Sequence, residues 1–172
     1  MSVATELLLD AFSRVQGSVH RAVDGLGVDD VAVQLDPEAN SVGWLLWHLT
    51  RVQDDHVSDV AGDEQRWTAA GWDERFGLPL PSTDTGYGHG PDDVAAVSGV
   101  PPADLVAYYD AVHERTLAFV RGLTDEDLDR VVDEGWDPPV TLGVRLVSVV
   151  DDCLEHAGQA NFVAGVLRRR QT

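Results

Sequence analysis

Asp152 and His156, in the C-terminal part of the sequence, are residue types that bind metal ions, and they stand four positions apart. In a helix, residues at this spacing lie one turn above each other on the same face. That face otherwise carries core-like side chains, so a carboxylate and an imidazole there cost desolvation energy unless something satisfies them. A divalent cation would satisfy both, with a third ligand supplied by another helix. A hydrogen bond between the two side chains at the surface would also account for the pair.

His48 is a candidate for the third ligand. It lies in an apolar stretch, on one helical stripe with Trp44, Leu45 and Val52. A lone histidine in such surroundings is also found as a satisfied core residue, so the stripe alone leaves its role open. Three protein ligands would leave a divalent ion with open coordination positions, which is the pattern of a catalytic site rather than a structural one.

Three further polar residues could support such a site from its surroundings. Gln159, three residues after His156, could orient that histidine or a bound ligand. His56 could face the same cavity, but its acidic neighbours favour a position at the surface, and we interpret it in that way. His89 lies in the glycine-rich segment 86–90, which could reach over the mouth of a bundle or simply be flexible.

Other residues that might carry chemistry are interpreted as structural. Cys153 lies about 100° around the helix from Asp152, which indicates a small core residue rather than a nucleophile. His20 and His113 belong to no motif. The sequence contains no serine nucleophile elbow, no glycine-rich phosphate loop and no paired-cysteine zinc motif. A metal-centred site is therefore the candidate chemistry, beside the surface hydrogen bond that would also account for Asp152 and His156.

Helical periodicity predicts the elements that must position these residues. Long helices are expected over about 5–25, 41–61, 102–121 and 142–169. The second begins at an Asn40-Ser41 cap and ends before Gly62. The near absence of period-two alternation predicts an all-α fold, a four-helix bundle formed by a single domain over residues 1–172.

The connection between the second and third long helices is unusually long and rich in glycine and proline. It spans 63–102, with short helical pieces expected near 64–70 and 91–97. Residues 124–128 resemble a further short, capped helix. The bundle should therefore contain a long crossover rather than a simple up-down-up-down arrangement.

The charge of the chain argues against several partners. Twelve basic residues stand against 30 acidic ones, for a formal net charge of -18, which would repel nucleic acid and anionic membranes. The only basic run, 168–170, is interpreted as a helix cap. No apolar run reaches the roughly 18 residues of a membrane span, and no secretory signal is visible. The single cysteine excludes an internal disulfide framework, so we expect a cytoplasmic protein.

Two segments resemble the signature helices of the DinB-like family. They are Ser41-Val-Gly-Trp-Leu-Leu-Trp-His-Leu49 and Glu155-His-Ala-Gly-Gln159, which occur in order, roughly 100 residues apart. Segments 86–94 and 136–145 resemble its actinobacterial branch, which contains relatives of mycothiol-dependent maleylpyruvate isomerase. The resemblance covers nearly the whole chain. It implies a four-helix bundle whose metal is held by one histidine from helix two and two ligands from the last helix.

Carried onto this sequence, the resemblance implies His48, Asp152 and His156 as the metal ligands. Position 152 is histidine in much of the family and glutamate in the isomerase, so the carboxylate agrees with the mycothiol-linked branch. Aspartate is one methylene shorter than glutamate, which bears on the coordination distance. Zinc is the default metal, with nickel and iron as alternatives.

The resemblance implies a metal-dependent enzyme that uses mycothiol, the small thiol of actinobacteria, to transfer or isomerise an electrophilic substrate. A cation with an open position can lower the pKa of a bound thiol, so that thiolate forms at neutral pH. Two other functions stay open. The same ligands could activate water for hydrolysis, or the fold could serve a non-catalytic metal-containing binding or stress-response protein. A homodimer is also compatible with the family.

Overall fold

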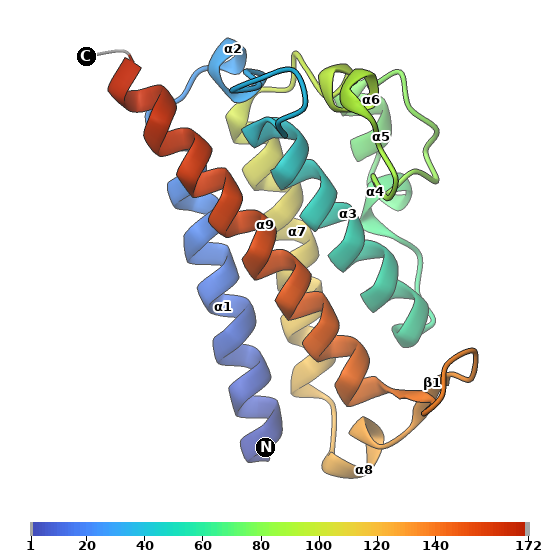
Figure 1. Cartoon of the computed structure of the whole chain (residues 1–172). Coiled ribbons are helices and arrows are strands. Elements are labelled where there is room, and N and C mark those ends of the chain that lie inside the picture. The colour runs from blue at the N-terminus through green and yellow to red at the C-terminus, as the bar shows by residue number, and fades with distance from the viewer. Residues whose placement is uncertain (1, 171–172) are drawn as a thin grey trace.

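Four long helices form a bundle in the computed structural model, which describes residues 2–170 (Figure 1). They are α1 (Val3–Val23), α3 (Val42–Ala61), α7 (Pro102–Arg121) and α9 (Leu142–Arg170). α1 and α9 run in one direction and α3 and α7 in the other, because the chain crosses the length of the bundle between α3 and α7. α1 and α3 each pack against both α7 and α9 and so lie diagonally. The predicted all-α bundle with a long crossover is confirmed.

Shorter elements connect the long helices. They are α2 (Val28–Val31), α4 (Arg66–Ala69), α5 (Trp72–Phe76), α6 (Pro91–Ala96), α8 (Asp125–Leu128), β1 (Val131–Asp133) and β2 (Val140–Thr141). The helical piece expected near 64–70 is α4, and α5, which follows the left-handed Gly71, was not predicted. α2 and the antiparallel β1–β2 hairpin were not predicted, because a helix of four residues and strands of three and two residues are too short to show a periodic pattern.

The ends of the helix that carries His48 are fixed by local chemistry. The Ser41 hydroxyl accepts a hydrogen bond from the Trp44 backbone N–H at 3.1 Å, and Gly62 ends the helix with a φ of 70°. Both were predicted from the sequence. The basic run at the end of α9 acts on a neighbouring helix, since the Arg168 guanidinium donates to the carbonyls of Arg21 and Asp24 at the end of α1.

The core between the four long helices is apolar and continuous. Residues without any exposed surface come from all four helices, namely Phe12, Val15, Leu46, Tyr108, Leu146 and Ala160. Cys153 is among the fully buried residues, and burial raises the pKa of its thiol well above the usual range, so its predicted role as a core residue is confirmed. Among the described residues, no helix combines the length and the apolar character needed to cross a membrane.

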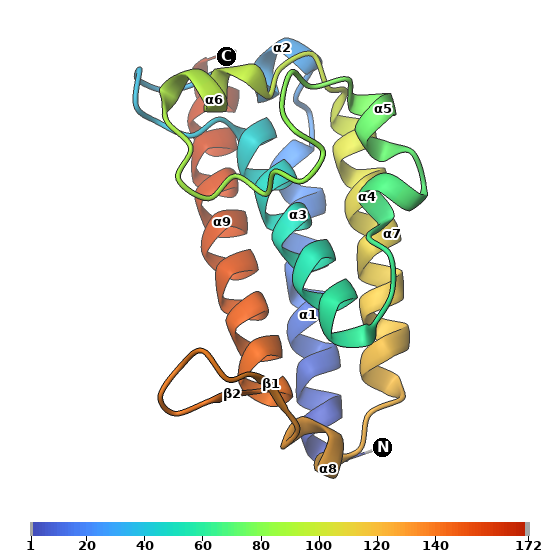
Figure 2. The same ribbon diagram turned by 90° about the vertical axis from the view of Figure 1, so that its right-hand side faces the viewer.

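A buried polar network attaches the crossover to α3. Arg51, fully buried, donates a hydrogen bond to the backbone carbonyl of Asp84 at 3.0 Å. One turn away, the Asp54 carboxylate accepts hydrogen bonds from the backbone N–H groups of Arg66 and Trp67 at 2.9 and 2.8 Å. Buried charges with several hydrogen bonds of this kind are costly to disrupt. These hydrogen bonds hold the crossover on α3, and Figure 2 shows the crossover passing over α3.

Candidate metal centre

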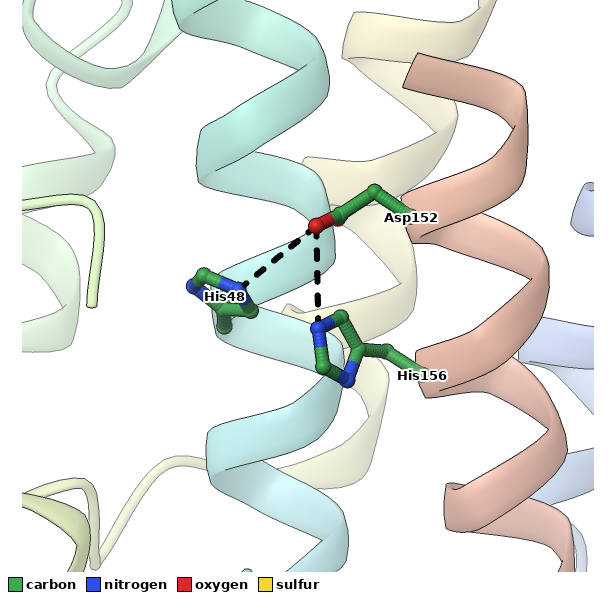
Figure 3. A group of neighbouring side chains, drawn as sticks. All are labelled: His48, Asp152 and His156. Carbon is green, nitrogen blue, oxygen red and sulfur yellow. Dashed lines mark ion pairs between the residues drawn. The ribbon is translucent and has the colours of Figure 1, made fainter. Parts of the chain in front are cut away.

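The three predicted metal-binding side chains point toward one another between α3 and α9 (Figure 3). Asp152 Oδ1 lies 4.0 Å from His48 Nε2 and 3.7 Å from His156 Nε2. One ligand atom from each residue falls within 4.8 Å of the others. Ligands of a tetrahedral zinc ion stand about 3.4 Å apart, so these atoms lie near enough to share one ion after small side-chain movements.

In both histidines, the ring nitrogen that faces away from the cluster contacts an oxygen acceptor. His48 Nδ1 donates to the backbone carbonyl of Thr85, and His156 Nδ1 lies 3.2 Å from Gln159 Oε1. Since a carbonyl oxygen can only accept, each proton is placed on Nδ1, and the Nε2 lone pair is left facing Asp152. Metal-ligating histidines are oriented in this way. Gln159 therefore occupies the orienting position that its sequence spacing suggested.

The electrostatics of the cluster favour a bound cation. Burial lowers the pKa of His48 to about 4, against the opposing effect of its hydrogen bond to Thr85, so the imidazole is neutral at pH 7. Burial raises the pKa of Asp152, although nearby His156 acts in the opposite direction. Asp152 Oδ2 is buried and has no hydrogen-bond partner among residues 2–170. Such an oxygen costs free energy, which a cation would offset.

A glycine in the crossover allows the chain to close over His48. Gly86 has a φ of 96°, and a Cβ atom there would lie 2.6 Å from His48 Nδ1 and 3.1 Å from the Trp47 ring. Only glycine fits this approach, which brings the neighbouring Thr85 carbonyl onto the imidazole. The Trp44 indole stacks on the His48 ring, with centroids 4.7 Å apart. The His48 imidazole is therefore held by the chain around it and is 3% exposed.

His89 secures this part of the crossover and lies outside the cluster. Its Nδ1 accepts a hydrogen bond from Trp44 Nε1 at 3.0 Å, and its Nε2 contacts the Asp84 carboxylate at 2.8 Å. The ring also stacks on Trp47, with centroids 5.7 Å apart. Segment 86–90 therefore reaches over the bundle, which is one of the two possibilities that the sequence left open.

The surface position expected for His56 is wrong. The side chain is half-buried and lines a cavity beside Asp152, and its Nδ1 accepts a hydrogen bond from Arg145 Nη1 at 2.9 Å. Neighbouring Asp55 instead accepts a hydrogen bond from Gln65 on the crossover. The acidic neighbours of His56 were misleading because its partner lies on α9, 89 residues further along the chain.

A cavity of about 440 Å³ adjoins the cluster at Asp152. Its lining comes from α3, the crossover, the hairpin and α9, and includes Val52, His56, Tyr87, Asp133, Trp136, Arg145 and Val149. The Tyr87 ring stands edge-on to the His48 ring, with centroids 5.3 Å apart. Residue-by-residue reasoning missed Thr85, Tyr87 and Trp136 as site residues. The signal for the two aromatics was present, since both lie in segments that resemble the actinobacterial branch.

A four-helix bundle with a histidine–carboxylate–histidine cluster between its second and last long helices is a DinB-like protein. The chain matches the mycothiol-S-transferase family over residues 7–168 and belongs to that family. A solved structure of a conserved protein from Enterococcus faecalis is 31% identical, with a TM-score of 0.89, and the match covers 95% of this chain and 96% of that one. A comparison with curated proteins gives no match. The predicted family is confirmed.

Proposed function

We propose that this chain is a divalent-metal-dependent enzyme that transfers the sulfur of mycothiol to an electrophilic small molecule. Membership of the mycothiol-S-transferase family supports mycothiol as the thiol and transfer, rather than isomerisation, as the reaction. The observation that carries metal dependence is the convergence of His48, Asp152 and His156, with both imidazoles presenting Nε2. Thiol transfer needs a thiolate, and a cation held by these residues would favour its formation.

Zinc is the metal that we propose for the centre. Two neutral imidazoles and one carboxylate suit zinc, and they also suit nickel or iron, so metal analysis has to distinguish the three. When bound, such an ion would supply an open position at which a thiol loses its proton near neutral pH. The neutral state of His48, which follows from its burial, means that no proton has to leave this ligand before metal binds.

The surrounding residues have distinct tasks in this proposal. Thr85 and Gln159 fix the two imidazoles, while the indole of Trp44 stacks on His48 and excludes water from that side. The open side adjoins the cavity at Asp152. There the thiol proton passes to water, the sulfur electron pair forms a bond to the electrophilic carbon, and the leaving group departs with its own electron pair. The product is a thioether.

Metal analysis and a transfer assay test the proposal together. The full chain, purified without a nickel column, should contain one ion, and it should form a mass-detectable conjugate from mycothiol and an electrophile. His48→Ala should lose both properties. His20→Ala removes a half-exposed histidine that pairs with Asp110, away from the cluster, and should keep both.

Two results would count against this function. Less than about a tenth of an ion per chain would remove the metal centre. Electrophile consumption at the same rate with and without mycothiol would indicate hydrolysis by metal-bound water instead of transfer.

A further inference from the structure

The cavity beside Asp152 lies between two segments that project over the same side of the bundle. The crossover supplies Tyr87 and the β1–β2 hairpin supplies Trp136, while α3 and α9 form the base. Figures 1 and 2 show the crossover and the hairpin on the side where α3 and α9 are adjacent. A molecule in this cavity would therefore be held from two sides and would reach the metal centre through the wall at Asp152.

Two large aromatic side chains in the cavity wall are mostly exposed. Trp136 is 68% exposed and Tyr87 is 62% exposed. Pro138 and Pro139 follow Trp136 closely and restrict the backbone of the hairpin loop, and Tyr87 lies in the crossover segment fixed on α3. Exposed rings on constrained segments beside a cavity are surfaces on which a ligand can stack.

The polar part of the lining is built for hydroxyl groups rather than for an anion. Arg145 donates to His56 Nδ1 and to Asp133 Oδ2, both at 2.9 Å. A guanidinium has five N–H donors, so these two bonds leave donors for a ligand. Its positive charge is already balanced by Asp133, and Asp152 adds a second carboxylate to the lining. Hydroxyl groups, which both donate and accept, match this mixture, whereas an anion would find the charge of Arg145 already paired with Asp133.

From this geometry we propose that the cavity binds the uncharged, hydroxyl-rich sugar portion of the thiol cosubstrate, with Trp136 and Tyr87 as stacking surfaces and Arg145 as hydrogen-bond donor. The proposal rests on the proposed transferase function for the identity of the thiol. It makes the two aromatic residues determinants of thiol specificity, because they distinguish a sugar-bearing thiol from a small one.

Two other cavities near the long helices lack these features. The cavity between α1 and α9 is lined by apolar side chains such as Leu7 and Val147. A third, near Phe162, touches the cluster only through Gln159, the partner of His156. Neither is lined by a residue of the candidate metal centre, so a ligand there could not present its sulfur directly to the ion.

The test is a binding titration with S-methylated mycothiol, which keeps the sugars but cannot form a thiolate. The full chain as purified should bind it, and Trp136→Ala and Tyr87→Ala should each raise the Kd about tenfold. Trp136→Phe should restore most of the affinity. Phe162→Ala removes an aromatic of similar exposure, 69%, outside this cavity and should leave the Kd unchanged. S-methylated N-acetylcysteinamide, which is uncharged and has no sugar, should bind equally weakly to all variants.

Two results would overturn the assignment. They are no binding of S-methylated mycothiol by the wild-type chain, or an unchanged Kd in both alanine variants. The titration needs neither a free thiol nor turnover, so the two proposals fail separately. If Trp136→Ala binds S-methylated mycothiol more weakly but the wild-type chain shows no transfer activity, only the proposed function is refuted. If the wild-type chain transfers mycothiol but the Kd of both alanine variants is unchanged, only the cavity assignment is refuted.

Discussion

Replacing Gly86 by alanine should weaken metal binding although residue 86 donates no ligand atom. The added Cβ would lie 2.6 Å from His48 Nδ1, about 0.8 Å closer than the 3.4 Å at which ordinary contact begins. The imidazole cannot give way, because Trp44 stacks on it, and the crossover must therefore move outward. That movement separates the Thr85 carbonyl from His48 Nδ1, and the orientation and tautomer of the ligand are no longer fixed.

The expected effect of Gly86→Ala has two parts. Loss of a hydrogen bond that orients a metal-ligating histidine lowers metal affinity by about 10- to 100-fold, or roughly 1.4 to 2.7 kcal/mol. Separately, an alanine at a φ of 96° is strained and lowers the free energy of unfolding by about 1–3 kcal/mol. Zinc affinity is measured by competition with a chromophoric chelator, and folding by urea unfolding of the metal-free chain.

Gly88→Ala provides the matched control for this prediction. Gly88 also has a positive φ, 76°, but a Cβ atom there meets nothing within 4 Å. This variant should carry the backbone strain and keep the wild-type zinc affinity. If Gly86→Ala binds zinc as tightly as Gly88→Ala does, the contact between Thr85 and His48 does not support the metal centre and the reasoning is wrong.

Three further predictions concern Asp152, Gln159 and His113. Asp152→Asn should abolish measurable metal binding but raise the Tm of the metal-free chain, because burial raises the pKa of Asp152 and so disfavours its charged form in the fold; a lower Tm would contradict this. Gln159→Ala should weaken zinc binding about tenfold, with more severe loss for His156→Ala, and equal losses would show that Gln159 does more than orient the ring. Burial lowers the pKa of His113, so the free energy of unfolding should fall as the pH drops through about 6.5, where the unfolded chain gains the proton first. Urea unfolding of His113→Phe should show a smaller pH dependence, and an unchanged one would exclude this histidine as the cause.

Local sequence signals were sufficient for the four long helices and for two of the three residues of the candidate centre. The limits of α3 follow from the cap at Ser41 and the left-handed Gly62, both of which act within a few residues. The Asp152–His156 pair follows from helical spacing. That His48 faces this pair depends on how α3 packs against α9, which periodicity does not specify. The resemblance to the DinB-like family provided that part.

The surroundings of the centre could not be predicted because they depend on contacts distant in sequence. The buried Arg51 holds the crossover through the Asp84 carbonyl, 33 residues away, and thereby places Thr85 on His48. The ion pair between Arg145 and Asp133 joins the hairpin to α9 beside His56. Neither contact has a local signature, so the orienting carbonyl and the cavity emerged only from the folded structure.

The central claim is that His48, Asp152 and His156 bind one cation, and anomalous diffraction from crystals of the chain grown with zinc tests it directly. The account predicts one strong anomalous peak about 2.1 Å from Nε2 of both imidazoles and from a carboxylate oxygen of Asp152, with His48 Nδ1 still donating to Thr85. A peak elsewhere, or coordination through Nδ1, would contradict it. So would crystals in which the two imidazoles point apart and no peak lies between α3 and α9.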